Sequence, residues 1–145
     1  RLSIMASTLK INTLTGVTTA GSIAVTAEGN STTTNLQQGL AKAWVNFDGG
    51  SVTSSADLTG VQDSFNMTSV VDSGTGNHEI TVTNVFTTDG FSSTSSCSGD
   101  SSNDNRSVCT DNEGTSGVSV NPHVCTSGSG SDVAEVHVTI HGDLA

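Results

Sequence analysis

The sequence contains few aromatic and few basic residues. Aromatic side chains make up 3% of its 145 residues, with one Trp, four Phe and no Tyr. Lys and Arg together number 4 against 14 Asp and Glu, which gives a formal net charge of −10 at pH 7. Nucleic acids and anionic membrane surfaces bind cationic proteins, so this composition argues against both partners. No apolar run approaches the length of a membrane-spanning helix.

Helical periodicity is also nearly absent. The only faint 3.6-residue repeat runs from Leu36 to Trp44, which indicates either one helical turn or a loop that enters a strand. Elsewhere, short alternating runs are broken by Gly, Asn, Asp and Ser, a pattern typical of all-β sandwiches. We therefore predict an all-β chain: an antiparallel β-sandwich of jelly-roll or immunoglobulin-like type, residues 36–145, preceded by an extended N-terminal arm, residues 1–35.

The N-terminal arm has too few apolar side chains to form a core of its own. One short strand is expected around Leu9–Leu14 and another around Ile23–Val25. Because so little apolar surface does not offset the entropy of ordering the chain, the arm is expected to pack on another subunit or a larger partner. The side chains predicted to make that contact are Leu9, Ile11, Leu14, Ile23 and Val25.

Alternating patterns predict the clearest strands of the sandwich. In "KAWVNF", Val45 and Phe47 alternate with Trp44, so the indole is expected on the opposite face. The last strand is expected to bury its three branched side chains, which are Val136, Val138 and Ile140.

The middle of the chain gives weaker signals. Residues 64–86 are expected to form a β-hairpin with a loop longer than two residues, with Phe65 and Met67 on one face. A Ser-rich stretch follows, with a short strand expected near Phe91 and another near Val108. Pro122 lacks an N–H group, which favours an edge strand or a bulge.

The cysteines and histidines do not form a metal motif. The odd number of cysteines cannot pair completely within one chain. Cys97 and Cys109 flank a predicted loop, so the alternatives are a Cys97–Cys109 disulfide and reduced thiols, of which the sequence favours reduced thiols. His137 and His141 would lie roughly 13 Å apart on a strand, too far to share one ion. No metal and no cofactor are expected.

Catalytic motifs are missing as well. No G-x-S-x-G elbow occurs, and no phosphate-binding glycine loop is followed by Lys. "DSSNDNRSVCTD" has Asp100, Ser102 and Asp104 at calcium-loop spacing. However, Asn105 replaces the required Gly and Asp111 the final Glu, so a solvated acidic loop is favoured. We do not expect an enzyme.

Four stretches of the sequence occur in a family-like order. They are "MASTLKINTLTG", "LQQGLAKAWVNFDG", "DSFNMTSVVDSGTGNHEITVTNVF" and a terminal "VTIHGDL". Together they resemble a family of small virion structural proteins of tailed bacteriophages, abundant in marine phages. The resemblance covers residues 5–86 well and the last strand more loosely. His78 departs from the family pattern, which has Tyr there, and Val82 stands where Phe is frequent.

The resemblance implies a non-enzymatic protein on the exterior of the virion. It implies a homotrimer whose arm docks on the major capsid protein or another virion protein while the β-domain projects outward. Trp44 lies at the junction of arm and β-domain, so it is expected to anchor an interface with the arm or a neighbouring subunit. The alternative is an indole in its own domain's core.

The resemblance leaves the position on the particle open. A capsid-decorating subunit, as head decoration or head fibre, is the leading expectation, and a tail-fibre or tail-knob subunit that contacts the host is the alternative. A carbohydrate-binding or adhesin module of a cell surface is a second alternative, and it would need an aromatic platform.

Overall fold

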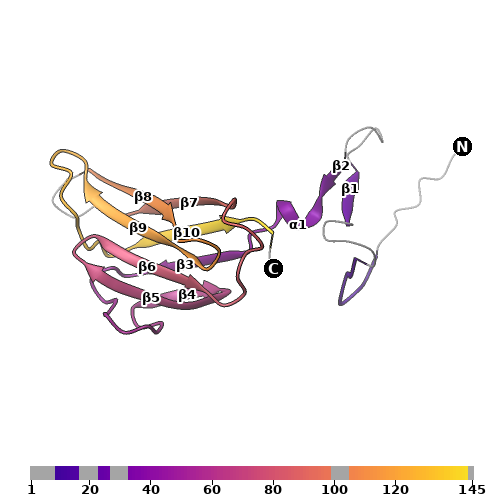
Figure 1. Ribbon diagram of the computed structural model, residues 1–145, viewed down its shortest axis with the longest axis horizontal. Coiled ribbons are helices and arrows are strands. Elements are labelled where there is room, and N and C mark those ends of the chain that lie inside the picture. The colour runs from indigo at the N-terminus through magenta and orange to yellow at the C-terminus, as the bar shows by residue number, and fades with distance from the viewer. Residues whose placement is uncertain (1–8, 17–22, 27–32, 99–104, 144–145) are drawn as a thin grey trace, which may run out of the picture. The chain divides into compact units, whose positions relative to one another are not determined.

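A computed structural model describes residues 9–16, 23–26, 33–98 and 105–143 of the chain. The chain divides into two compact units, Arg1–Gln37 and Gln38–Ala145 (Figure 1). This boundary lies two residues beyond the one expected between arm and sandwich, after residue 35.

The first unit contains a small antiparallel ribbon. β1 (Ala24–Thr26) pairs with β2 (Thr33–Asn35). The N–H of Leu36 donates to the carbonyl of Ile23 at 2.9 Å, which extends this pairing by one bond. α1 (Leu36–Gly39) follows as a single helical turn, so the faint periodicity there marks helix rather than loop.

The expected arm strand around Leu9–Leu14 is wrong. The described residues 9–16 have no strand structure, whereas the expected strand around Ile23–Val25 is present as β1. A strand needs a neighbour for its backbone N–H and C=O groups. Among the residues described in this unit, β1 has such a neighbour in β2, and residues 9–16 have none.

The second unit is a sandwich of two four-stranded antiparallel sheets, as predicted. The first sheet has the order β4-β3-β10-β7. Its strands are β3 (Ala43–Phe47), β4 (Val61–Phe65), β7 (Ser92–Cys97) and β10 (Val136–His141).

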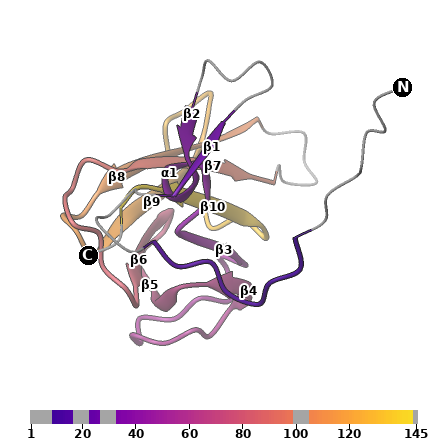
Figure 2. The same cartoon turned by 90° about the vertical axis from the view of Figure 1, so that its right-hand side faces the viewer.

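The second sheet has the order β5-β6-β9-β8. Its strands are β5 (Met67–Gly74), β6 (Asn77–Val82), β8 (Arg106–Asn112) and β9 (Gly117–Val124). Figure 2 shows the two sheets as separate layers. Because β6 pairs with β9 and β10 with β7, the chain crosses between the sheets in a Greek-key manner.

The core between the sheets is thin and built mainly from Val. β3, β6 and β10 alternate between buried and outward side chains, as predicted for β3 and β10. Trp44 lies on the outward side of β3 and is not part of the core. The buried apolar side chains are Ala43, Val45, Phe47, Val52, Met67, Val70, Ile80, Val82, Phe86, Phe91, Val118, Val120, Val133, Val136, Val138 and Ile140.

The prediction that Phe65 and Met67 share a face is wrong. Phe65 ends β4 in the first sheet and is 53% exposed, whereas Met67 begins β5 in the second sheet and is buried. Asn66 between them has a φ of 59°, in the left-handed region. This single residue turns the chain from one sheet to the other, so the alternation of side chains does not continue through it.

The hairpin is also tighter than predicted. β5 and β6 are joined by only Thr75 and Gly76, a two-residue turn instead of a longer loop. Gly76 has a φ of 66°, and a Cβ at this position would lie 2.3 Å from the backbone nitrogen of Ser131. Only glycine fits there, because the turn needs both the left-handed conformation and a close backbone approach.

Pro122 lies on an inner strand and not on an edge strand, which was one of the two alternatives expected. β9 has β6 on one side and β8 on the other. Pairing with β6 ends at Val120, and the carbonyl of Pro122 accepts the N–H of Ser131 at 3.0 Å. The proline nitrogen, which has no N–H to donate, therefore faces residues beyond the pairing with β6. No hydrogen bond between β6 and β9 is lost because of it.

Candidate functional site

The outer face of the first sheet is the most distinctive surface of the sandwich. Register places Phe65, Trp44, Thr139 and Thr94 in one row across its four strands. Phe65 is exposed and Trp44 is partly exposed, so a large aromatic pair stands on this face beside two threonine hydroxyls. Cross-strand neighbours lie about 4.5–5.5 Å apart at Cβ, which brings the two rings within reach of one ligand.

The next row of this face is polar. It contains Asp63, Asn46, His137 and Ser96. The Asn46 amide donates to the Gln62 side-chain oxygen at 3.0 Å, which fixes the orientation of that amide. We call the two rows together the aromatic face. They combine apolar rings with hydroxyl and amide groups on a flat sheet.

The histidines on this face do not converge. His137 pairs across from Asn46, and His141 lies four residues further along β10. His137 Nε2 is 3.9 Å from a Glu135 carboxylate oxygen, but both side chains are about half exposed, so this pair contributes little to stability. Within the described ranges, no three His, Cys, Asp or Glu side chains lie close enough to hold a metal ion.

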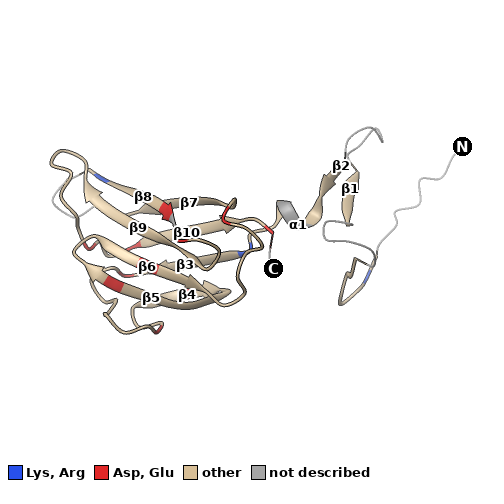
Figure 3. Cartoon of the chain, in the orientation of Figure 1, with Lys and Arg blue, Asp and Glu red and all other residues tan. Residues whose placement is uncertain are grey.

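Charge is spread over the sandwich rather than gathered at one site. Figure 3 shows Asp and Glu positions, in red, on strands and loops across the sandwich. With a formal net charge of −10, the chain repels anionic partners as a whole.

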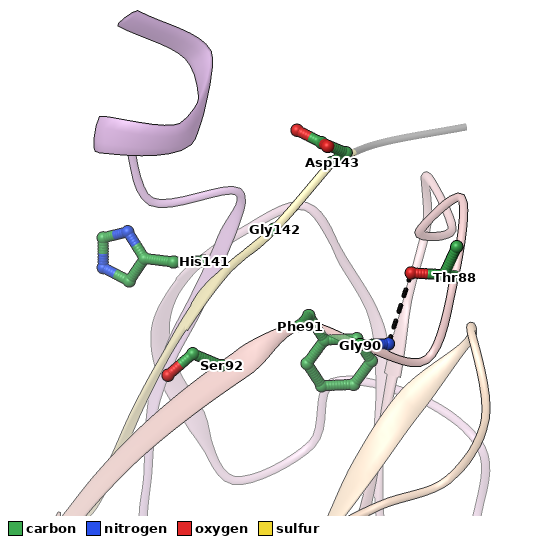
Figure 4. Close-up of a pocket in the computed structure, with 7 residues that line it drawn as sticks. All are labelled: Thr88, Gly90, Phe91, Ser92, His141, Gly142 and Asp143. Atoms are coloured by element: carbon green, nitrogen blue, oxygen red, sulfur yellow. Dashed lines mark hydrogen bonds between the residues drawn. The ribbon is translucent and has the colours of Figure 1, made fainter. Parts of the chain in front are cut away.

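A shallow pocket of about 230 Å³ lies where β7 begins and β10 ends (Figure 4). Ser92, His141 and Asp143 all line it, and these are residue types used in nucleophilic catalysis. In Figure 4 the hydrogen bond between the drawn residues joins the N–H of Gly90 to the Thr88 hydroxyl. Ser92, His141 and Asp143 are therefore not linked as a catalytic triad would be.

Sequence reasoning missed a buried polar group in the core. His78 is completely buried, and its Nε2 lies 3.3 Å from the carbonyl oxygen of Gly49 and 3.9 Å from Asp132 Oδ1. Its ring packs on Phe47 with centroids 5.2 Å apart. Asp132 also accepts the N–H of Gly76 at 2.7 Å, which holds the β5–β6 turn. The alternation with Ile80 and Val82 could have placed His78 inside.

All three cysteines are free thiols, so the less favoured alternative of a Cys97–Cys109 disulfide is not formed. Cys97 belongs to the inward set of β7 and packs against the core, whereas Cys109 is exposed on β8. Side chains on opposite faces of their sheets do not meet, which explains why these two residues are unpaired.

The predicted contact residues of the N-terminal unit are mostly exposed. Leu9 is 78% exposed, and Val25 on β1 is 53% exposed. Ile11 and Leu14 are also exposed, and Ile23 is partly exposed. Their contact with a partner stays a prediction. Asp100, Ser102 and Asp104 of the calcium-like loop lie outside the described residues.

Comparison with known proteins gives no relative for this chain: no family model, no curated protein and no solved structure matches it. None of the helical residues that the structure describes belongs to a helix long and apolar enough to cross a membrane.

Proposed function

We propose that this chain is a non-enzymatic structural protein of a tailed-phage particle, in which the first unit attaches to the particle and the sandwich is displayed outside. The observation that carries the proposal is the difference between the two units in the burial of their apolar side chains. The sandwich has its own buried core, whereas the described apolar side chains of the first unit are largely exposed. The order of the sequence motifs, which resembles small virion proteins, supports the same assignment.

The exposed side chains of the first unit suit a docking role. Leu9, Ile11 and Leu14 lie within six residues of one another and are all exposed. Burial of apolar surface contributes about 25 cal/mol per Å², so a partner that covers them stabilises this segment. The proposed partner is the major capsid protein or another virion protein, and the proposed oligomer is a homotrimer.

Trp44 serves this assembly as an interface anchor. It lies at the start of β3, close in sequence to the first unit, and on the face that the core does not use. Trp is enriched among the residues that dominate binding energy at protein interfaces. The acidic surface keeps displayed sandwiches apart from one another and from anionic surfaces.

The experiment compares particle attachment by two triple variants. Leu9→Ser/Ile11→Ser/Leu14→Ser removes the exposed apolar side chains, and Lys10→Ala/Asn12→Ala/Thr13→Ala is the matched control in the same segment. Particles that lack the protein are incubated with each variant, and bound protein is quantified after sedimentation. We expect binding to fall at least tenfold for the first variant and less than threefold for the second. Full attachment of the first variant would contradict the proposal.

Imaging of decorated particles then locates the protein. Density on capsid capsomers supports head decoration, whereas density at the tail vertex supports the tail-fibre alternative. Density with three sandwiches around one axis supports the trimer.

A second candidate function is glycan binding, which the aromatic pair of Trp44 and Phe65 specifically favours. Sugar rings stack on exposed aromatic side chains, and the adjacent hydroxyl and amide groups provide hydrogen bonds. Binding of a glycan array by the protein, lost in Trp44→Ala and Phe65→Ala but kept in Val85→Ala, would favour this function. Val85 is a suitable control because it is an exposed apolar residue outside the aromatic face.

A further inference from the structure

Two of the three thiols lie at the same end of the sandwich, one from each sheet. Cys97 is the last residue of β7 in the first sheet. Cys125 directly follows β9 in the second sheet, and its N–H donates to the carbonyl of Asn105 at 2.9 Å. Asn105 in turn precedes β8, so Cys125 lies beside the start of that strand.

The edges of the two sheets meet between β7 and β8. The hydroxyl groups of Ser93 and Thr110 are 3.0 Å apart, which fixes one point of contact between these strands. Side chains on one face of a strand recur every second residue. Four residues after Ser93 on β7 and four residues before Thr110 on β8, this spacing places Cys97 opposite Arg106. Arg106 pairs with Val124 in the second sheet, so Cys125 is only one residue beyond that pair.

The surroundings of the Cys97 thiol are consistent with this arrangement. Burial raises the pKa of the Cys97 thiol, a thiolate at Cys125 raises this pKa further, and the Arg106 guanidinium lowers it. Cys109 has no part in this cluster, because it is exposed on the outward side of β8.

We propose that Cys97 and Cys125 form a reversible disulfide that joins the two sheets when the protein meets a small disulfide oxidant. Of these two thiols, Cys125 is the exposed one and reacts first. Its thiolate attacks one sulfur of oxidised glutathione, a bond to that sulfur forms, and one glutathione thiolate leaves.

The second step closes the bridge between the sheets. The Cys97 thiolate attacks the Cys125 sulfur of the mixed disulfide and releases the second glutathione thiolate. The two protons lost by the cysteines go to the two glutathione thiolates, so two thiols are oxidised and one glutathione disulfide is reduced. The bridge closes a chain segment that contains both β8 and β9.

The bridge restrains the unfolded chain and joins the end of β7 in the first sheet to the end of β9 in the second. Disulfides that close loops of this length raise stability by reducing the entropy of the unfolded state. For a domain of about this size, we expect oxidation to raise Tm by on the order of 10 °C.

The experiment uses the full chain and two single variants. Each protein is incubated with oxidised or reduced glutathione at pH 8, and free thiols are then blocked with N-ethylmaleimide. Digestion with trypsin and a glutamate-specific protease separates the cysteines into residues 80–106, 107–113 and 114–135. We expect a cross-linked pair of residues 80–106 and 114–135, with Cys109 outside the cross-link as its maleimide or glutathione adduct, and a higher Tm than for the reduced protein.

The variants separate this bridge from other oxidation products. Cys109→Ser should form the bridge as the natural chain does, because Cys109 takes no part. Cys97→Ser should stop at a glutathione adduct on Cys125 and show no rise in Tm. A bridge that involves Cys109, an adduct on Cys125 that persists while Cys97 remains reactive to maleimide, or an oxidised protein that melts below the reduced one would each overturn the proposal.

Discussion

Replacement of Asn66 is expected to destabilise the sandwich because this residue forms the corner between the two sheets. Its side-chain amide donates to the carbonyl of Lys42 at 3.0 Å and to that of Asn84 at 3.2 Å. Its side-chain oxygen accepts the backbone N–H of Asn84 at 2.8 Å. Lys42 precedes β3 in the first sheet and Asn84 follows β6 in the second, so one side chain ties both layers together.

The magnitude follows from two separate contributions at Asn66. The Asn84 side-chain amide also donates to the Asn66 side-chain oxygen at 3.0 Å, which makes four side-chain hydrogen bonds at Asn66. Such bonds contribute about 0.5–1.5 kcal/mol each, and partial exposure places their sum near 2 kcal/mol. The left-handed φ of 59° costs an alanine about 1 kcal/mol more than it costs asparagine or glycine. We therefore expect the free energy of unfolding to fall by about 3 kcal/mol for Asn66→Ala and by about 2 kcal/mol for Asn66→Gly.

Urea denaturation followed by the fluorescence of Trp44 measures both values, because Trp44 is the only Trp in the chain. Asn66→Asp is the third variant. It keeps the acceptor for Asn84 but loses both donors and places a carboxylate against two carbonyl groups, so it should be no more stable than Asn66→Gly. Equal stability of the Ala and Gly variants would refute the role of the backbone conformation, and a loss below 0.5 kcal/mol for all three would refute the role of the corner.

Two further substitutions test the packing of the sandwich. Val138→Ala should cost about 2–3 kcal/mol in urea denaturation because it leaves a cavity in the core, whereas its outward neighbour Thr139→Ala should change the free energy of unfolding by less than about 0.5 kcal/mol. Comparable losses at both sites would contradict the assigned faces. Gly117→Ala should cost about 3 kcal/mol or more, because its Cβ would lie 1.9 Å from the carbonyl oxygen of Ile80 in the neighbouring strand; a thermal melt unchanged from the natural chain would exclude this backbone approach.

The parts of the fold that the sequence predicts correctly are strands with one apolar face. In β3 and β10 every second residue is Ala, Val, Ile or Phe. The apolar residues therefore recur with the two-residue period of a strand, and a strand buries all of them on one face. The short strands expected near Phe91 and Val108 are present as β7 and β8. These two are nearly all polar, and their full extent depends on pairing with β10 and β9, which local sequence does not encode.

The errors arise where distant residues decide the local structure. The corner at Asn66 depends on hydrogen-bond partners 24 and 18 residues away, so no local sequence pattern predicts it. Val52 and Val133 lie in connections outside the strands, yet both are buried in the core. Phe65 and Trp44 are neighbours only because of the register of β4 against β3. The sequence does not predict that register, so it did not predict the aromatic face.

The position of β3 also has a mechanical consequence. The chain leaves the first unit and enters the sandwich through β3, which is bonded to β4 on one side and β10 on the other. Tension applied through the first unit therefore loads two hydrogen-bonded ladders at once, and the N–H of Lys42 adds a bond of 2.8 Å to the carbonyl of Ile140 at the point of entry. An edge strand in this place would peel away along a single ladder. Both ladders must break before β3 leaves the sandwich, so a tether at this inner strand is held by more hydrogen bonds than a tether at an edge strand.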